Sequence, residues 1–219
     1  MQNRVFDDRR DAGRALVPEL ERCKFENPLI LGLPRGGVPV AFEVAAALKA
    51  PLDVFVVRKL GAPFQPELAI GAIASGGVRV LNHDVVSALG VDDAAVENIV
   101  AREAEELDRR ERLYRGDHPY PELADYDVVL VDDGIATGAT IRAAVEGIRA
   151  MQPSSITVAV PTGSTSSVRE VRRLADKVIC LETPWDFYAV GQFYRDFSQT
   201  TDDEVRDLLE QARQARANT

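Results

Sequence analysis

One stretch, residues 128–140, constrains the fold of this chain more than any other. It opens with the apolar run 128–131, which is typical of a strand buried on both faces of a sheet. Two adjacent carboxylates, Asp132 and Asp133, follow directly, and a loop of small residues then leads into the helical spacing of 141–151. This order predicts an α/β unit with polar groups at the carboxyl end of a buried strand, where such sheets bind ligands.

The loop 134–140 has the composition of an anion site. Gly134 and Gly138 permit backbone conformations that a Cβ obstructs, and Thr137 and Thr140 add hydroxyl donors beside the start of a helix. A phosphate alone would not need an acid pair beside it. A phosphorylated sugar would, because carboxylates accept hydrogen bonds from its hydroxyls or lie near magnesium. The other interpretation is a strand-end turn whose aspartates cap the helix, but the complete string favours the sugar phosphate.

A second strand–loop–helix unit lies upstream. An apolar strand is expected at 28–33 and an alanine-rich helix at 38–49, and the turn between them contains Arg35, Gly36 and Gly37. The glycines allow close backbone approach, and the guanidinium offers donors suited to phosphate. This turn is therefore a candidate for a second anion site, the alternative being an ordinary turn with a surface arginine.

The next predicted strand, 53–57, ends in two cations, Arg58 and Lys59. Cations at the end of a buried strand need anions to satisfy them. Those anions are either the phosphates of a ligand or, as the structural alternative, Asp132 and Asp133.

Residues 62–82, rich in glycine and proline, predict a flap with two short β segments, at 68–74 and 78–81. Such lids shield reactive centres from water. Glu67 is the acid best placed to act inside a closed flap, although a solvated loop residue is an equally open interpretation.

The remaining elements are read from apolar spacing and capping residues. We expect helices at 1–25, 94–114, 164–175 and 201–217, and strands at 155–160 and 177–181. The helix 94–114 carries alternating charges and is read as solvated or facing a partner. After the last strand, Trp185, Phe187 and Tyr188 either stack on a flat heterocycle or form a small satellite core.

Composition limits the classes of function. The chain has 219 residues, enough for one domain, and its formal net charge of −9 argues against a general nucleic-acid or anionic-membrane binder. No apolar run suits a membrane span, and a cytoplasmic protein is expected. Cys23 and Cys180 are read as reduced packing residues, and the isolated His83 and His118 suggest no metal site.

The string 128–140 resembles the signature of the type I phosphoribosyltransferases, which bind 5-phosphoribosyl-1-pyrophosphate (PRPP). The resemblance implies that Asp132 and Asp133 meet the ribose hydroxyls and a Mg²⁺ ion, directly or through water. It assigns the 5′-phosphate to Ala136, Thr137, Gly138, Ala139 and Thr140. It assigns the pyrophosphate to Arg35, Gly36, Gly37, Arg58 and Lys59.

The resemblance covers a core of about 28–181 and implies a single domain, 1–219. The expected fold is α/β, with a doubly wound, mainly parallel sheet, a flexible β-flap and a small hood formed by 1–27 and 182–219. Lys59 and Glu67 would join the acid pair in catalysis, and Trp185, Phe187 and Tyr188 would meet the acceptor. Ala136 departs from the hypoxanthine-guanine branch, which has an acid there, so the adenine branch is the better match.

The series of motifs is most similar to bacterial stand-alone phosphoribosyltransferases of unassigned acceptor. The expected activity is Mg²⁺-dependent transfer of the 5-phosphoribosyl group from PRPP to a nitrogen acceptor, such as a nucleobase, with release of pyrophosphate. The alternatives are a PRPP- or nucleotide-sensing regulator and a hydrolase or phosphorylase of a phosphoribosyl compound. Family members are often dimers, so the resemblance is compatible with a homodimer, while the oligomeric state, the acceptor and the general acid or base stay open.

Overall fold

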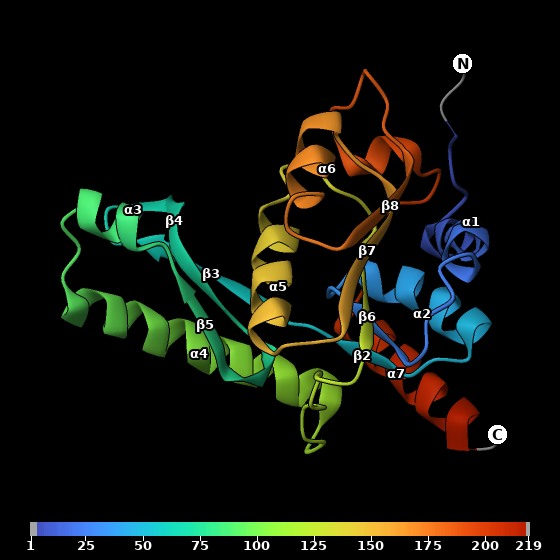
Figure 1. The fold of residues 1–219 in the computed structure, drawn as a ribbon, viewed down its shortest axis with the longest axis horizontal. Coiled ribbons are helices and arrows are strands. Elements are labelled where there is room, and N and C mark those ends of the chain that lie inside the picture. Colours follow the sequence, from blue (N-terminus) through green and yellow to red (C-terminus); the bar gives the residue numbers. More distant parts are fainter. Residues whose placement is uncertain (1–3, 218–219) are drawn as a thin grey trace.

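The computed structural model describes residues 4–217 and is built on a five-stranded sheet (Figure 1). Its strand order is β2-β1-β6-β7-β8, and every neighbouring pair is parallel. The strands are β1 (Pro28–Gly32), β2 (Leu52–Val54), β6 (Asp127–Val131), β7 (Ser155–Thr162) and β8 (Lys177–Glu182). The order reverses between β1 and β6, so the doubly wound, mainly parallel sheet expected from the sequence is confirmed.

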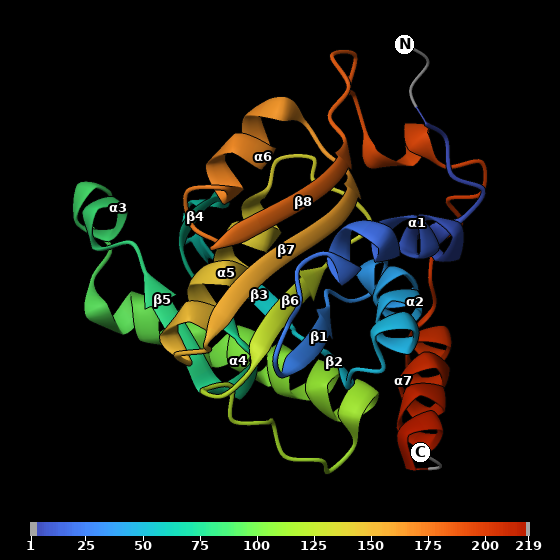
Figure 2. The ribbon, with the colours of Figure 1, turned by 45° about the vertical axis from the view of Figure 1, so that its right-hand side comes forward.

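Helices cover both faces of this sheet (Figure 2). One face carries α1 (Arg9–Glu21) and α2 (Gly37–Leu48), and the other carries α5 (Ala139–Ala150) and α6 (Thr165–Val171). Alternate side chains of β6 pack into two hydrophobic cores, one on each face of the sheet. Val129 and Val131 pack with α1 and α2, whereas Val128 and Leu130 pack with α5 and α6. Burial on both faces explains the continuous apolar run.

A second, antiparallel sheet projects from the body (Figure 1). It contains β3 (Val57–Ala62), β4 (Gln65–Ala74) and β5 (Val78–Leu81), with a 3₁₀ turn at Ser75–Gly77. We call these three strands the flap. The expectation of a two-stranded flap was wrong, because the segment that holds Arg58 and Lys59 is its first strand.

The predicted strand 53–57 is confirmed only at its start, because β2 ends at Val54 and Val57 begins β3, and the hydrogen bonds show why. Phe55 still donates its N–H to Gly32 of β1, at 3.1 Å. At Val56 the chain turns to a new partner: its N–H donates to Ser75 Oγ at 2.9 Å, and its carbonyl accepts from Ser75 N at 2.9 Å. Val56 is therefore the junction between the two sheets.

The charged helix expected at 94–114 is α4 (Asp93–Arg115), which Asp92 caps by accepting from Ala95 N at 2.7 Å. A further short helix, α3 (His83–Ala88), precedes it in the chain. Leu60, Ile70 and Ile99 share one apolar cluster, so the flap rests on α4.

The terminal segments meet over the carboxyl ends of the strands. The expected helix 1–25 is shorter: α1 starts after its N-cap Asp8, while residues 1–3 lie outside the described part. Phe6 instead donates its N–H to Phe193 O at 2.8 Å, where residues Val190–Phe193 form a 3₁₀ turn. The last helix, α7 (Asp202–Ala217), packs against α2 and α4, and Thr201 Oγ1 accepts from Glu204 N at 3.1 Å.

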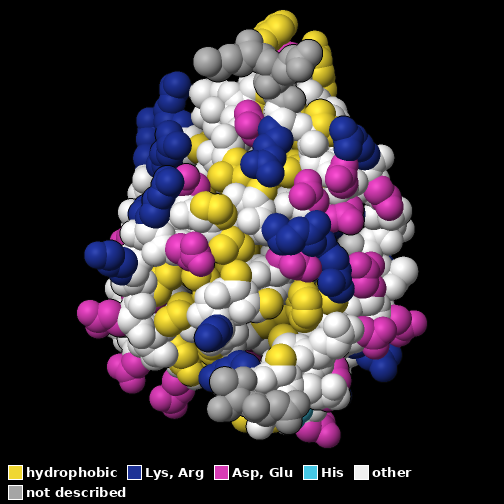
Figure 3. All heavy atoms as spheres, turned by 90° about the vertical axis from the view of Figure 1, so that its right-hand side faces the viewer, with side chains coloured by type: hydrophobic (Ala, Val, Ile, Leu, Met, Phe, Trp, Pro, Cys, Tyr) yellow, Lys and Arg dark blue, Asp and Glu magenta, His cyan; other side chains and the backbone are white. Residues whose placement is uncertain are grey.

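On the side of the molecule that carries α1, α2 and α7, basic and acidic side chains are interspersed, with hydrophobic side chains gathered between them (Figure 3). Within residues 4–217, no helix combines the length and apolar character needed to cross a membrane.

The contact between α1 and α2 yields a stability prediction. A Cβ on Gly13 would lie 2.6 Å from the Val40 carbonyl oxygen and 2.9 Å from Glu43 Cβ. Helix propensity alone favours Gly13→Ala by about 1 kcal/mol, but overpacking costs about 1–3 kcal/mol. We expect the variant to lower Tm, by about 2–4 °C per kcal/mol, in a circular dichroism melt. A higher Tm would show that the helices do not approach this closely.

Candidate active site

The candidate site lies where the strand order reverses. The loops that leave β1 and β6 start side by side and lead to helices on opposite faces of the sheet, which is the place where open α/β sheets bind ligands. The structure thus brings together the two loops that the sequence marked separately, around Gly36 and around Asp133.

The two loops touch through glycines. A Cβ on Gly36 would lie 2.1 Å from Asp133 Oδ2, and one on Gly37 would lie 2.6 Å from the Val131 carbonyl oxygen and 3.0 Å from Asp132 Oδ1. Gly36 has φ −63°, a conformation open to any residue, so its requirement for glycine is steric. The Pro34–Arg35 peptide bond before them is cis.

The acid pair is largely buried, and this burial controls its charge. Asp132 Oδ1 accepts from the Asp133 N–H at 2.9 Å. Burial, and then the neighbouring charge of Asp133, raise the pKa of Asp132 well above its usual range. Burial also raises the pKa of Asp133, although the guanidinium of Arg9 acts in the opposite direction. A site of this kind favours a cation or hydroxyl donors beside the two carboxylates.

Arg9 is one of the residues that sequence reasoning missed, and it contacts the acid pair directly. Its Nε donates to Asp133 Oδ2 at 2.8 Å and its Nη1 donates to the Ser198 carbonyl at 2.7 Å, while the guanidinium lies 4.1 Å from the Phe197 ring centroid. The side chain is only 12% exposed. Tyr194 completes the cluster by donating its hydroxyl to the Asp133 carbonyl at 2.6 Å. The acid pair is therefore held by both terminal segments.

The predicted 5′-phosphate loop is fixed at its base and open at its tip. The Ala136 carbonyl accepts from the hydroxyls of Ser164 and Ser167, at 3.0 and 2.8 Å, two serines to which sequence reasoning gave no role. Gly138, with φ +74°, occupies the N-cap position of α5 and has no side chain to cap it, and Thr137 Oγ1 accepts from Ala139 N only at 3.5 Å. Thr137 is exposed at the tip. The loop thus presents the positive end of α5 to solvent, as an anion site requires.

A cleft of about 800 Å³ connects this loop to the flap. Ala139 and Thr140 line it on one side, and Lys59 of β3 lines it on the other. The structure therefore places Lys59 across a cleft from the start of α5.

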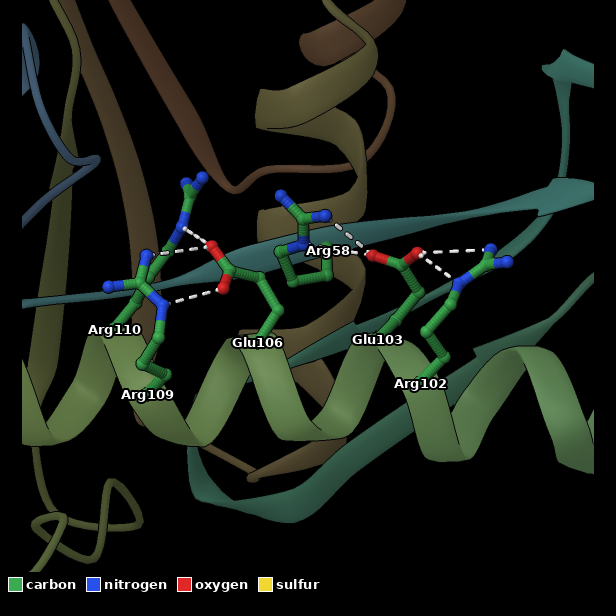
Figure 4. Close-up of polar contacts among 6 residues, drawn as sticks. All are labelled: Arg58, Arg102, Glu103, Glu106, Arg109 and Arg110. Atoms are coloured by element: carbon green, nitrogen blue, oxygen red, sulfur yellow. Dashed lines mark hydrogen bonds and ion pairs between the residues drawn. The ribbon is translucent and has the colours of Figure 1, made fainter.

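Arg35 and Arg58, both predicted to bind pyrophosphate, have protein partners. Arg35 Nη1 lies 3.8 Å from Asp202 Oδ1, a loose pair in which both side chains are more than one-third exposed. Arg58 makes a closer pair with Glu103 of α4, at 2.6 Å (Figure 4). The alternative that Arg58 pairs with Asp132 or Asp133 was wrong.

Glu67 belongs to β4, but its side chain lies outside the described part of the structure. Its predicted role therefore stays a prediction.

The aromatic segment divides between surface and core. Trp185 and Tyr188 are 93% and 89% exposed. Phe187 instead stacks on Phe193, with ring centroids 5.6 Å apart. The segment still touches the central loop, because a Cβ on Gly134 would lie 2.6 Å from Val190 Cγ1. Gln192, also unnoticed in the sequence, holds the turn by accepting from Tyr188 N at 2.9 Å.

The donor set fits a magnesium ion that is shared with a ligand. Across residues 4–217 there is no group of three or more His, Cys, Asp or Glu side chains placed to hold a metal. The acid pair supplies two carboxylates, and Mg²⁺ is commonly bound by one or two carboxylates together with substrate phosphates and water.

The buried charges predict an unusual stability profile. Because burial raises the folded-state pKa of Asp132, its ionised form destabilises the fold at neutral pH, and stability is regained as pH falls through that raised pKa. Asp132→Asn should therefore raise Tm at pH 7.5, by about 2–4 °C per kcal/mol, and lose this advantage in acid. Thermal melts across pH measure it.

Asp133→Asn is the matched control. It leaves the buried Arg9 without its carboxylate, so we expect a lower Tm. Equal Tm shifts for Asp132→Asn and Asp133→Asn would contradict the conclusion that the two carboxylates have opposite effects on stability.

Comparison with known proteins identifies the family. The family described as "Phosphoribosyl transferase domain" matches residues 9–198. "Putative phosphoribosyl transferase Rv0571c" of Mycobacterium tuberculosis is 53% identical over 210 residues, which is 95% of this chain and 47% of that protein. The same values hold for "Putative phosphoribosyl transferase MT0597" of a second strain. This chain thus spans about half the length of the curated relatives it matches.

Among solved structures, TT1426 from Thermus thermophilus is similar over nearly its whole length. It has 42% sequence identity and a TM-score of 0.87, covering 94% of this chain and 98% of that one. With its parallel sheet, strand-end loops and family match, the chain belongs to the phosphoribosyl transferase family, and its fold is the type I fold that the sequence resemblance implied.

Proposed function

We propose that the chain transfers the 5-phosphoribosyl group from PRPP to a nitrogen acceptor and releases pyrophosphate. The observation that carries this proposal is the contact between the glycine turn at Gly36 and the acid pair, beside the open start of α5. These parts supply one anion loop on each side of two sugar-binding carboxylates, which is the order of charges along PRPP.

Each group of PRPP has a matching group in the protein. The loop from Ala136 to Thr140 would hold the 5′-phosphate, and Asp132 and Asp133 would accept hydrogen bonds from the ribose hydroxyls. The backbone at Gly36 and Gly37 would meet the pyrophosphate. Arg35 is available to join it, because its pair with Asp202 is long and exposed to solvent.

Asp132 and Asp133 would hold a Mg²⁺ ion, which when bound would supply positive charge for the pyrophosphate. The transfer breaks the bond between C1 and the pyrophosphate oxygen, which keeps the electron pair. The acceptor nitrogen then supplies the pair for the new bond to C1 and loses a proton. Catalysis would be mostly positioning and charge stabilisation, with the two carboxylates facing the cationic sugar.

The flap and the aromatic turn would complete the reaction site. Lys59 and Glu67 are proposed to act from the flap, and Phe187, with the exposed Trp185 and Tyr188, is proposed to meet the acceptor. Ala136 has no acid to offer an oxopurine at this position. An acceptor of another kind is therefore the better expectation.

A pyrophosphate-release assay with PRPP, Mg²⁺ and a panel of purines, pyrimidines and other nitrogen compounds tests the activity. We expect one acceptor class to support turnover. Asp132→Asn should lower kcat/KM about 10–100-fold, because it weakens charge-assisted hydrogen bonds to the ribose.

Asp125→Asn is the control for this variant. Asp125 is exposed and lies just before the N-terminal end of β6, whereas Asp132 follows its carboxyl end. It should retain activity. PRPP binding without turnover for any acceptor would favour a sensor, and turnover with water or phosphate alone would favour a hydrolase or phosphorylase.

A further inference from the structure

We propose that Glu103 is a positioning residue that holds Arg58 against α4, so that Lys59, and not Arg58, is the cation that the flap presents to the ligand cleft. This inference rests on the proposed function for its catalytic consequence. The contacts themselves do not depend on it.

Alternation along β3 separates the two neighbouring cations. Leu60 is fully buried in the apolar cluster that includes Ile99 of α4, and Arg58 lies on the same face of the strand. Val57 and Lys59 lie on the opposite face, and both line the 800 Å³ cleft beside Thr140. Arg58 and Lys59 both line a second cleft, of about 590 Å³, between the flap and α4, whereas only Lys59 of the two lines the larger one.

Glu103 is the centre of a small ion cluster (Figure 4). Its Oε2 accepts from Arg58 Nε at 3.0 Å and from Arg58 Nη2 at 2.6 Å. Its Oε1 accepts from Arg102 Nε and Nη2 at 3.3 and 3.2 Å. The Glu103 side chain is 13% exposed, and that of Arg58 is 28% exposed. One carboxylate thus satisfies an arginine of the flap and an arginine of its own helix.

This geometry makes Arg58 a poor candidate for a ligand contact. Moving its guanidinium to a pyrophosphate would break two charge-assisted bonds and leave the largely buried Glu103 with Arg102 alone. Keeping the Arg58–Glu103 pair avoids the cost of leaving a largely buried carboxylate underpaired. It also fixes the orientation of β3 on α4. Lys59 follows directly in the chain, so its direction toward the cleft is set by the same contact.

A second ion pair between the flap and α4 provides a matched control. Arg79 of β5 meets Glu97 at 2.7 Å, similar in distance to the Arg58–Glu103 pair. Glu97 is 64% exposed, however, and exposed pairs contribute little. Glu103→Gln and Glu97→Gln therefore make the same chemical change on the same helix, in a largely buried pair and in an exposed one.

The first measurement is hydrogen exchange of the flap amides in the wild type, Glu103→Gln and Glu97→Gln, without any ligand. We expect faster exchange across β3 in Glu103→Gln and wild-type exchange in Glu97→Gln. Equal exchange in all three proteins would overturn the proposal. This test holds even if the chain does not turn over PRPP, so its result is separate from that of the proposed function.

The second measurement is a double-mutant cycle on pyrophosphate release with Arg58→Met, Glu103→Gln and the double variant. If Arg58 acts through Glu103, each single variant lowers kcat by about tenfold with little change in KM for PRPP, and the double variant is no worse. Arg58→Met raising KM strongly while Glu103→Gln stays at the wild-type value would identify Arg58 as a ligand residue and overturn the proposal.

Discussion

The contact between Gly36 and the Asp133 carboxylate is the constraint on which the rest of the site depends. Because no Cβ fits between them, the loops that leave β1 and β6 approach as closely as backbone and carboxylate allow. The two strands are neighbours in the sheet, but their helices leave to opposite faces. The approach therefore places the Gly36 turn and the start of α5 beside the two acids, where the strand order reverses.

The acids are held there at an electrostatic cost. Burial disfavours their charge, and the protein offsets part of this cost with Arg9, the first residue of α1. Arg9 also binds the Ser198 carbonyl, and Tyr194 binds the backbone of Asp133. Contacts from both terminal segments thus fix the position of Asp133. Destabilising charges of this kind are common where a site is shaped for a ligand instead of for stability.

Local pattern was sufficient to predict the core of the fold. The two-sided burial of β6, the small residues after it and the glycine turn at Gly36 each appear within a short window of sequence. Val56 was misplaced because an apolar run continues through it, whereas the change of partner from β1 to Ser75 is a tertiary event. A strand assigned from its own residues cannot show where its partner changes.

The ion-pair partners of the charged side chains could not be predicted from the sequence for the same reason. Arg9 reads as a helix-surface arginine until α1 is placed over the strand ends. Glu103 reads as one of many alternating charges on α4 until the flap is laid against it (Figure 4). Spacing along a helix predicts contacts within that helix. It carries no information about which of several similar glutamates faces another element.

The most direct measurement is a calorimetric titration of the purified protein and of Gly36→Ala with PRPP, with and without Mg²⁺. It needs no acceptor. We expect metal-dependent binding in the wild type, and loss of that binding in a folded Gly36→Ala, because the added methyl separates the glycine turn from the acid pair. Absence of wild-type binding at millimolar PRPP, or equal binding by both proteins, would contradict the assignment of the Gly36 turn and the acid pair to PRPP.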